Sequence, residues 1–172
     1  GCIVAAKNDH AHQSLTTQFA RRSTDKIYLA VTRSRPVPDH GTVFTHISRH
    51  PVNRQKMAVV DPPGGRPSIT DYRSLVTDPD NHSTLVVCRL HTGRTHQIRV
   101  HMAHLGCPLL GDPIYSRPAR QQARPGRLML HSWHLAFDHP RGGRRISCTA
   151  PIPPEFNPWL ALLGRAPDPD DP

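Results

Sequence analysis

Long apolar segments are missing from this sequence of 172 residues. No run of 18 consecutive apolar residues occurs, which excludes a transmembrane helix. No charged and then apolar signal peptide opens the sequence as given. The four cysteines lie far apart and form no Cys-x-x-Cys pair, and none has the sequence context of a nucleophile. We therefore expect four reduced thiols and a cytoplasmic protein.

Negative charge is scarce as well. The sequence has 13 aspartates and glutamates against 22 lysines and arginines, which gives a formal net charge of +9. Such an excess of positive charge is typical of proteins with a polyanionic partner, and the guanidinium groups of arginine pair well with phosphate. The alternative is a basic protein that has no such partner.

Many short strands and few helices are predicted. Proline contributes 19 residues, and each interior proline breaks a helical hydrogen bond, so the chain cannot be mostly long helix. Residues 2–6 are expected as a buried strand, and Ala11, Leu15 and Phe19 repeat as the stripe of an amphipathic helix. The other expected elements are strands at residues 26–32, 41–48, 56–60, 68–76, 83–90, 128–137 and 144–150 and helices at residues 95–105 and 153–163. This pattern predicts one α+β domain over residues 1–165, followed by a disordered tail at residues 166–172.

Residues 92–104 are the densest group of polar side chains. On a helical wheel, Gln97 and His101 share one flank of the apolar face, and Arg99 lies on the opposite flank. Arg94 and Thr95 fall at the start of the helix, where free backbone N–H groups are suited to phosphate. An ordinary amphipathic helix with a cationic solvent face explains the same pattern equally well.

A zinc site is the competing interpretation of this segment. His101, His104 and Cys107 have side chains that bind zinc. However, the two histidines lack the i, i+4 spacing of an HExxH helix, and no glutamate that could act as a base stands nearby. We therefore expect no metal.

Several motifs, taken together, resemble the RluA-type RNA pseudouridine synthases. The resemblance rests on GRTHQIRVH at residues 93–101, AHLG at 103–106 and GDPIY at 111–115. It extends to KIYLA at residues 26–30, to HP at 50–51 with GGR at 64–66 and TDY at 70–72, and to LH at 130–131. So many matches in the same order cover almost the whole chain and make the resemblance specific.

This resemblance implies a mixed, largely antiparallel sheet with flanking helices and a basic cleft. It also implies the isomerisation of uridine to pseudouridine in structured RNA, in ribosomal or transfer RNA, by a monomer without cofactor or metal. The essential aspartate of the family stands in an HRLD-x-x-T-S-G motif, and Gly1 resembles the last residue of that motif. We therefore expect the aspartate to lie upstream of Gly1 and the chain to be inactive alone.

Two catalytic roles follow from the resemblance. Arg99 matches the arginine that pairs with the catalytic aspartate, and without that aspartate it is expected to be a costly unpartnered charge. Tyr28 matches the tyrosine that stacks on the target base and takes its C5 proton, and Leu130 matches a leucine beside that base. Judged from the residues alone, Tyr28 and Leu130 are ordinary core positions.

The remaining expectations concern RNA contacts. Arg94, Thr95, His96 and Gln97 are expected to contact the RNA or its phosphates. Asp112, in GDPIY, is interpreted as a turn residue. The alternative to an enzyme is a non-catalytic RNA-binding remnant or pseudoenzyme, which the missing HRLD motif and the positive charge would also fit.

Overall fold

The computed structural model describes residues 1–116 and 125–169. Except for residues 2–6 and the closing helix, the predicted strands and helices are confirmed, with shifts of at most two residues at their ends. The single helix predicted at residues 153–163 is a short 3₁₀ helix followed by an α-helix. The strands are β1 (Asp25–Thr32), β2 (His40–Arg49), β3 (Met57–Val60), β4 (Arg66–Thr77), β5 (Thr84–Leu90), β6 (Leu130–Asp138) and β7 (Arg145–Thr149). The helices are α1 (Asp9–Arg21), α2 (Gln97–His104), the short 3₁₀ helix η2 (Pro154–Phe156) and α3 (Asn157–Leu163).

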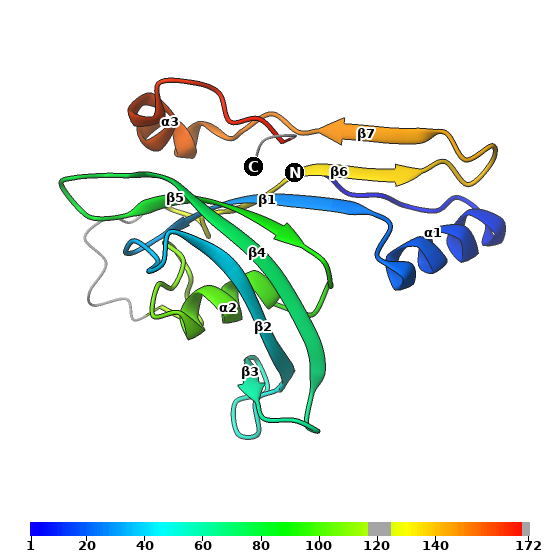
Figure 1. Ribbon diagram of the computed structural model, residues 1–172, viewed down its shortest axis with the longest axis horizontal. Helices are drawn as coiled ribbons and strands as arrows, with labels where there is room; N and C mark the ends of the chain where they lie inside the picture. The colour runs from blue at the N-terminus through cyan, green and yellow to red at the C-terminus, as the bar shows by residue number, and fades with distance from the viewer. Residues whose placement is uncertain (117–124, 170–172) are drawn as a thin grey trace.

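All seven strands form one sheet in the order β3-β2-β4-β5-β1-β6-β7 (Figure 1). Every pairing between these strands is antiparallel, which confirms the α+β class. β1 lies inside the sheet, between β5 and β6, although it is the first strand of the chain. A central strand carries hydrogen bonds on both edges, so its side chains have well-defined positions.

The two faces of the sheet bury different clusters, because side chains alternate along each strand. On one side, Ile27, Leu29 and Val31 pack with Phe156 and Trp159 of the closing helices, and we call this side the α3 face. On the other side, which we call the α2 face, β1 contributes Ala30 and part of Tyr28 to a cluster with α2. Figure 1 shows α3 above the sheet and α2 below it.

Helix α1 covers the far end of the α2 face. The side chain of Asn8 accepts a hydrogen bond from the N–H of Ala11 and caps the helix, as that residue type favours. Leu15 packs against Leu135 and Phe137 of β6. Because α1 and α2 cover separate parts of this face, the middle of β1 and β6 lies between them (Figure 1).

The strand predicted at residues 2–6 is not formed. The N–H of Cys2 donates to the carbonyl of Ser132 at 2.7 Å, but Ile3 is 92% exposed and residues 2–6 have no regular structure. β6 pairs with β1 on one edge and, from His134 to Asp138, with β7 on the other, so Cys2 meets β6 just before that pairing, at Ser132 and Trp133.

The end of the chain has little regular structure. Residues 166–169 have none, and residues 170–172 of the predicted tail lie outside the described residues. The longest described helix, α1, has 13 residues, and no helix in the described part of the chain is both long and apolar enough to cross a membrane.

Candidate active site

The expected site residues gather around α2 and the neighbouring strands on the α2 face. Tyr28 and Leu130 are both partly buried, and both pack against the cluster that contains Ile98 and Met102 of α2. Ser132 is the cross-strand partner of Tyr28 on β6, and the N–H of Cys2 bonds to the Ser132 carbonyl. The start of the chain is therefore held one strand away from Tyr28.

Arg99 forms a buried ion pair. Its Nε and Nη2 both donate to the carboxylate of Asp112, each at 2.8 Å, and the side chain of Asp112 is fully buried. The expectation that Arg99 lacks a partner is wrong. Asp112 has the predicted turn role, since it accepts the N–H groups of Ile114 and Tyr115, but it is also the counterion of Arg99.

The charges of this pair are stabilised by each other. Burial works to raise the pKa of Asp112, but hydrogen bonds from Arg99 and from two backbone N–H groups outweigh it, so the pKa lies below its ordinary value. The hydrogen bond to Asp112 raises the pKa of Arg99. The pair uses two of the five N–H donors of the guanidinium, so other donors remain for a second anion.

Tyr115 joins three elements at this place. Its hydroxyl oxygen accepts the N–H of Met57, the first residue of β3, at 2.7 Å. The same hydroxyl lies 3.0 Å from Nδ1 of His96, and the Arg99 guanidinium lies 5.0 Å from the centre of the Tyr115 ring. Burial and the nearby Arg99 lower the pKa of His96, so this ring is neutral near pH 7.

Gln97 differs from its expected role. It is 2% exposed, and its Nε2 donates to the carbonyl of Ile69 and to the hydroxyl of Thr70. Its Oε1 accepts the hydroxyl of Thr92 and the N–H of Arg94. With its amide used in this way, Gln97 fixes the loop before α2 onto β4 and does not itself face a ligand.

The residues before α2 are more accessible. α2 begins at Gln97, with His96 as its N-cap in the left-handed conformation, so Arg94 and Thr95 lie in the preceding turn. Thr95 is exposed, and Arg94 is partly exposed with its Nε donating to the carbonyl of Pro67. Of the four residues expected to contact RNA, Arg94, Thr95 and His96 therefore remain available on the surface.

His101 is fully buried between two strands. Its ring nitrogens lie 2.8 Å from the Thr70 hydroxyl and 2.9 Å from the Thr45 hydroxyl. Burial, with a smaller effect of His104, lowers the pKa of His101 to about 4. Both nitrogens are thus engaged by threonines, and no group of three His, Cys, Asp or Glu within residues 1–116 and 125–169 is placed to hold a metal ion.

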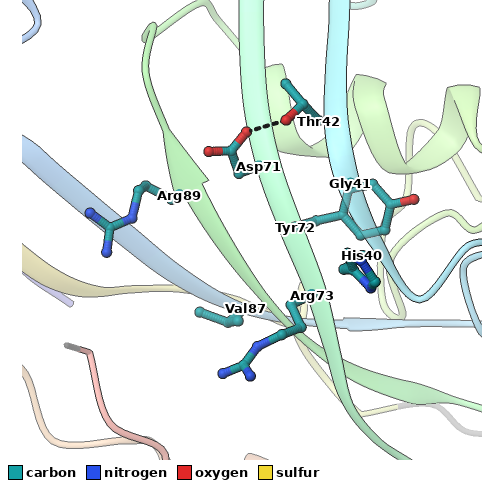
Figure 2. Close-up of a pocket in the computed structure, with 8 residues that line it drawn as sticks. All are labelled: His40, Gly41, Thr42, Asp71, Tyr72, Arg73, Val87 and Arg89. Atoms are coloured by element: carbon teal, nitrogen blue, oxygen red, sulfur yellow. Dashed lines mark hydrogen bonds between the residues drawn. The ribbon is translucent and has the colours of Figure 1, made fainter. Parts of the chain in front are cut away.

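Two hollows lie outside this centre. One lies between α1 and the hairpin of β6 and β7, where Lys7 and Arg141 bring positive charge to the α2 face. The other lies on the α3 face of β2, β4 and β5, where the Thr42 hydroxyl donates to Asp71 (Figure 2). Figure 2 shows the side chains of Arg73 and Arg89 in this hollow, and none of the expected site residues is among the residues that line it.

Sequence reasoning missed Asp112 as a counterion and Tyr115 as a contact of three elements. A signal was present, because both residues belong to the GDPIY motif at residues 111–115. The motif places them one and four residues after Gly111, but nothing in the sequence says that this turn folds back against α2.

The comparisons with known proteins agree with this geometry. The family model described as RNA pseudouridylate synthase matches residues 1–104. An uncharacterised RNA pseudouridine synthase of Chloroflexus aurantiacus is 46% identical over 95% of this chain and 50% of its own length. A ribosomal large subunit pseudouridine synthase D of Zymomonas mobilis is 40% identical over 95% of the chain and 52% of its own length. The chain thus spans about half the length of these curated relatives.

Solved structures give the same result. Human RNA pseudouridylate synthase domain containing 1 has a TM-score of 0.74 and 28% sequence identity, over 96% of this chain and 76% of that chain. Human RNA pseudouridylate synthase domain containing 4 has a TM-score of 0.70 and 27% identity, over 94% of this chain and 70% of that chain.

Proposed function

Because this chain belongs to the RNA pseudouridylate synthase family, we propose that it forms the part of a uridine-to-pseudouridine isomerase that holds the target uridine of a structured RNA. The observation that carries the proposal is the position of Tyr28. It lies on the α2 face, between the α2 cluster and Ser132, where the start of the chain is bonded. A segment joined to Gly1 would enter the same place.

Three expected residues, Tyr28, Leu130 and Arg99, have positions that suit their proposed roles. The ring of Tyr28 is partly exposed on a central strand, where it can stack on a base and accept its C5 proton, and Leu130 lies beside it in the same cluster. Arg99 is oriented by Asp112 and has further N–H donors with which it can keep the reactive carboxylate ionised. A uridine would reach these groups only if it left its stack, as in base flipping.

Positive groups on both sides of Tyr28 support an RNA substrate. Arg94 lies before α2, and Lys7 and Arg141 line the hollow near α1. We propose ribosomal RNA as the first substrate to test, because several relatives carry the name ribosomal large subunit pseudouridine synthase D, with transfer RNA as the second. The four cysteines form no disulfide, which fits the cytoplasmic location that we propose. We also propose that the protein is a monomer.

The test compares the chain alone with the chain preceded by the HRLD-x-x-T-S segment of its gene or of a relative. Pseudouridine is measured in bulk ribosomal and transfer RNA. We expect activity only in the longer form, because the reactive carboxylate belongs to that segment. The names of the relatives favour an enzyme over a non-catalytic remnant, but inactivity of both forms with salt-sensitive RNA binding retained would favour the remnant.

Tyr28→Phe tests the chemistry within the longer form. The ring that stacks on the base is kept and the proton acceptor is lost, so we expect the rate to fall about 10²- to 10⁴-fold while RNA affinity is retained. Tyr72→Phe is the matched control, since Tyr72 belongs to the same cluster but its hydroxyl donates to the carbonyl of Pro38. Equal activity of Tyr28→Phe and the unaltered protein would exclude Tyr28 as the proton acceptor.

A further inference from the structure

A basic hairpin joins β2 to β3 next to α2. Its loop, residues 50–56, projects beyond the sheet in Figure 1, and residues 51–55 are exposed. Arg49, Arg54 and Lys56 give it a concentration of positive charge. The loop is internally ordered, since the His50 ring accepts the N–H groups of Val52 and Asn53. Such a preformed cationic loop is suited to RNA phosphates.

The hairpin has a specific hydrogen bond to the site. The N–H of Met57 follows the loop directly, and it donates to the Tyr115 hydroxyl at 2.7 Å, across 58 positions of sequence. His50 and Lys56 pair across the base of the loop, because the N–H of His50 donates to the carbonyl of Lys56. A change in the position of Met57 therefore changes the position of the whole loop relative to Tyr115.

Tyr115 is itself held on the other side by the catalytic arginine pair. Asp112 accepts the backbone N–H of Tyr115 at 3.1 Å, and the Arg99 guanidinium lies against the Tyr115 ring. The hydroxyl also meets Nδ1 of His96. Since the hydroxyl oxygen accepts from Met57 and the His96 ring is neutral, the arrangement that satisfies all three groups has the Tyr115 O–H donating to Nδ1 and the ring proton on Nε2.

We propose that Tyr115 is a positioning residue that sets the basic hairpin of residues 49–56 at a fixed place relative to Arg99. The proposal rests on the proposed function, because it is the RNA held by the hairpin whose uridine Arg99 and Tyr28 would meet. Tyr115 touches neither the base nor the reacting atoms. Its hydroxyl acts through Met57 and His96, and its ring and backbone act through Arg99 and Asp112.

Tyr115→Phe separates these two connections. The ring against Arg99 and the backbone bond to Asp112 remain, and the bonds to Met57 and His96 are lost. In the full-length enzyme we expect KM for RNA to rise about tenfold, the size of effect that the loss of one hydrogen bond commonly has, with kcat changed less than about twofold. The slope of log affinity against log salt should decrease by about 1 for each phosphate contact the loop loses.

Tyr72→Phe is the control, because the Tyr72 hydroxyl, like that of Tyr115, has a hydrogen bond to the main chain, and the Tyr72 side chain is the more buried of the two. We expect both variants to lower the melting temperature to a similar extent, and only Tyr115→Phe to change KM and the salt slope. Equal changes of KM in the two variants, or a lower kcat with unchanged KM, would overturn the proposal.

Two measurements that need no catalytic activity distinguish the positioning role of Tyr115 from the proposed isomerase function. Amide hydrogen exchange at Met57 should become faster in Tyr115→Phe and stay the same in Tyr72→Phe, and RNA affinity should fall only in the former. If the unaltered full-length protein makes no pseudouridine, the proposed function fails, and these two measurements still decide the role of Tyr115. Unchanged hydrogen exchange at Met57 together with unchanged RNA affinity in Tyr115→Phe would exclude Tyr115 as a positioning residue.

Discussion

The two faces of the sheet handle charge in opposite ways. On the α2 face, Arg99 and Asp112 form an ion pair whose side chains are 11% and 0% exposed. On the α3 face, Asp25 bonds to Arg145 and lies 3.6 Å from Arg89, and these side chains are 35–45% exposed. Buried charges are retained only with full pairing, whereas exposed pairs contribute little to stability.

The two kinds of ion pair differ in how strictly they fix the orientation of their side chains. The exposed charges are shared among several partners, since Arg145 pairs with both Asp138 and Asp25, so no single geometry is required of them. The buried pair has two parallel hydrogen bonds and a backbone contact from each of two residues, which leaves one geometry. A guanidinium fixed in this way is suited to act on a second carboxylate.

Asp112→Asn should have the largest effect. The asparagine can still accept the backbone N–H groups of Ile114 and Tyr115, but Arg99 becomes a buried charge without a counterion. We expect the free energy of unfolding to fall by about 3–5 kcal/mol, measured by urea denaturation at pH 7. The double variant Arg99→Met with Asp112→Leu is the control, and it should lose less because no unpaired charge remains. A loss below about 1 kcal/mol in Asp112→Asn would contradict this view of the α2 face.

A pH effect of intermediate size comes from His101 on the same face. Its pKa of about 4 in the folded state lies below the value of about 6.5 for an unfolded chain, so the unfolded chain binds more protons between these values. Stability should therefore fall as the pH falls from about 6.5 to 4, by up to about 3 kcal/mol from this group. His101→Gln should remove that part of the pH dependence, and an identical pH profile in the variant would show that His101 becomes protonated without unfolding.

The fold could be predicted from the sequence because its signals are local. The repeat of Ala11, Leu15 and Phe19 marked α1, and Leu15 is the residue of that helix that the structure buries. The strand expected at residues 2–6 was wrong because a strand needs a free neighbour, and an apolar pattern does not report whether one exists.

The site could be predicted only in part. Tyr28, Leu130 and Arg99 were proposed from motifs. The structure places Tyr28 and Leu130 against one cluster and pairs Arg99 with Asp112, and the roles of all three stay predictions. The partnership of Arg99 with Asp112 and the buried amide of Gln97 depend on contacts between distant segments. Membership of a motif does not tell whether a polar residue contacts a ligand or holds a neighbouring residue that contacts the ligand.

Asp25→Asn is the same substitution on the α3 face and should have the smallest effect. Asp25 exchanges its bonds with Arg145 and Arg89 for bonds with water at little loss, because all three side chains are already solvated. We expect the free energy of unfolding to fall by less than about 1 kcal/mol, and by less still in high salt, which screens exposed charges. A loss as large as that of Asp112→Asn would mean that the charges of the α3 face form one cooperative network, and exposure alone would then not explain how the two faces differ.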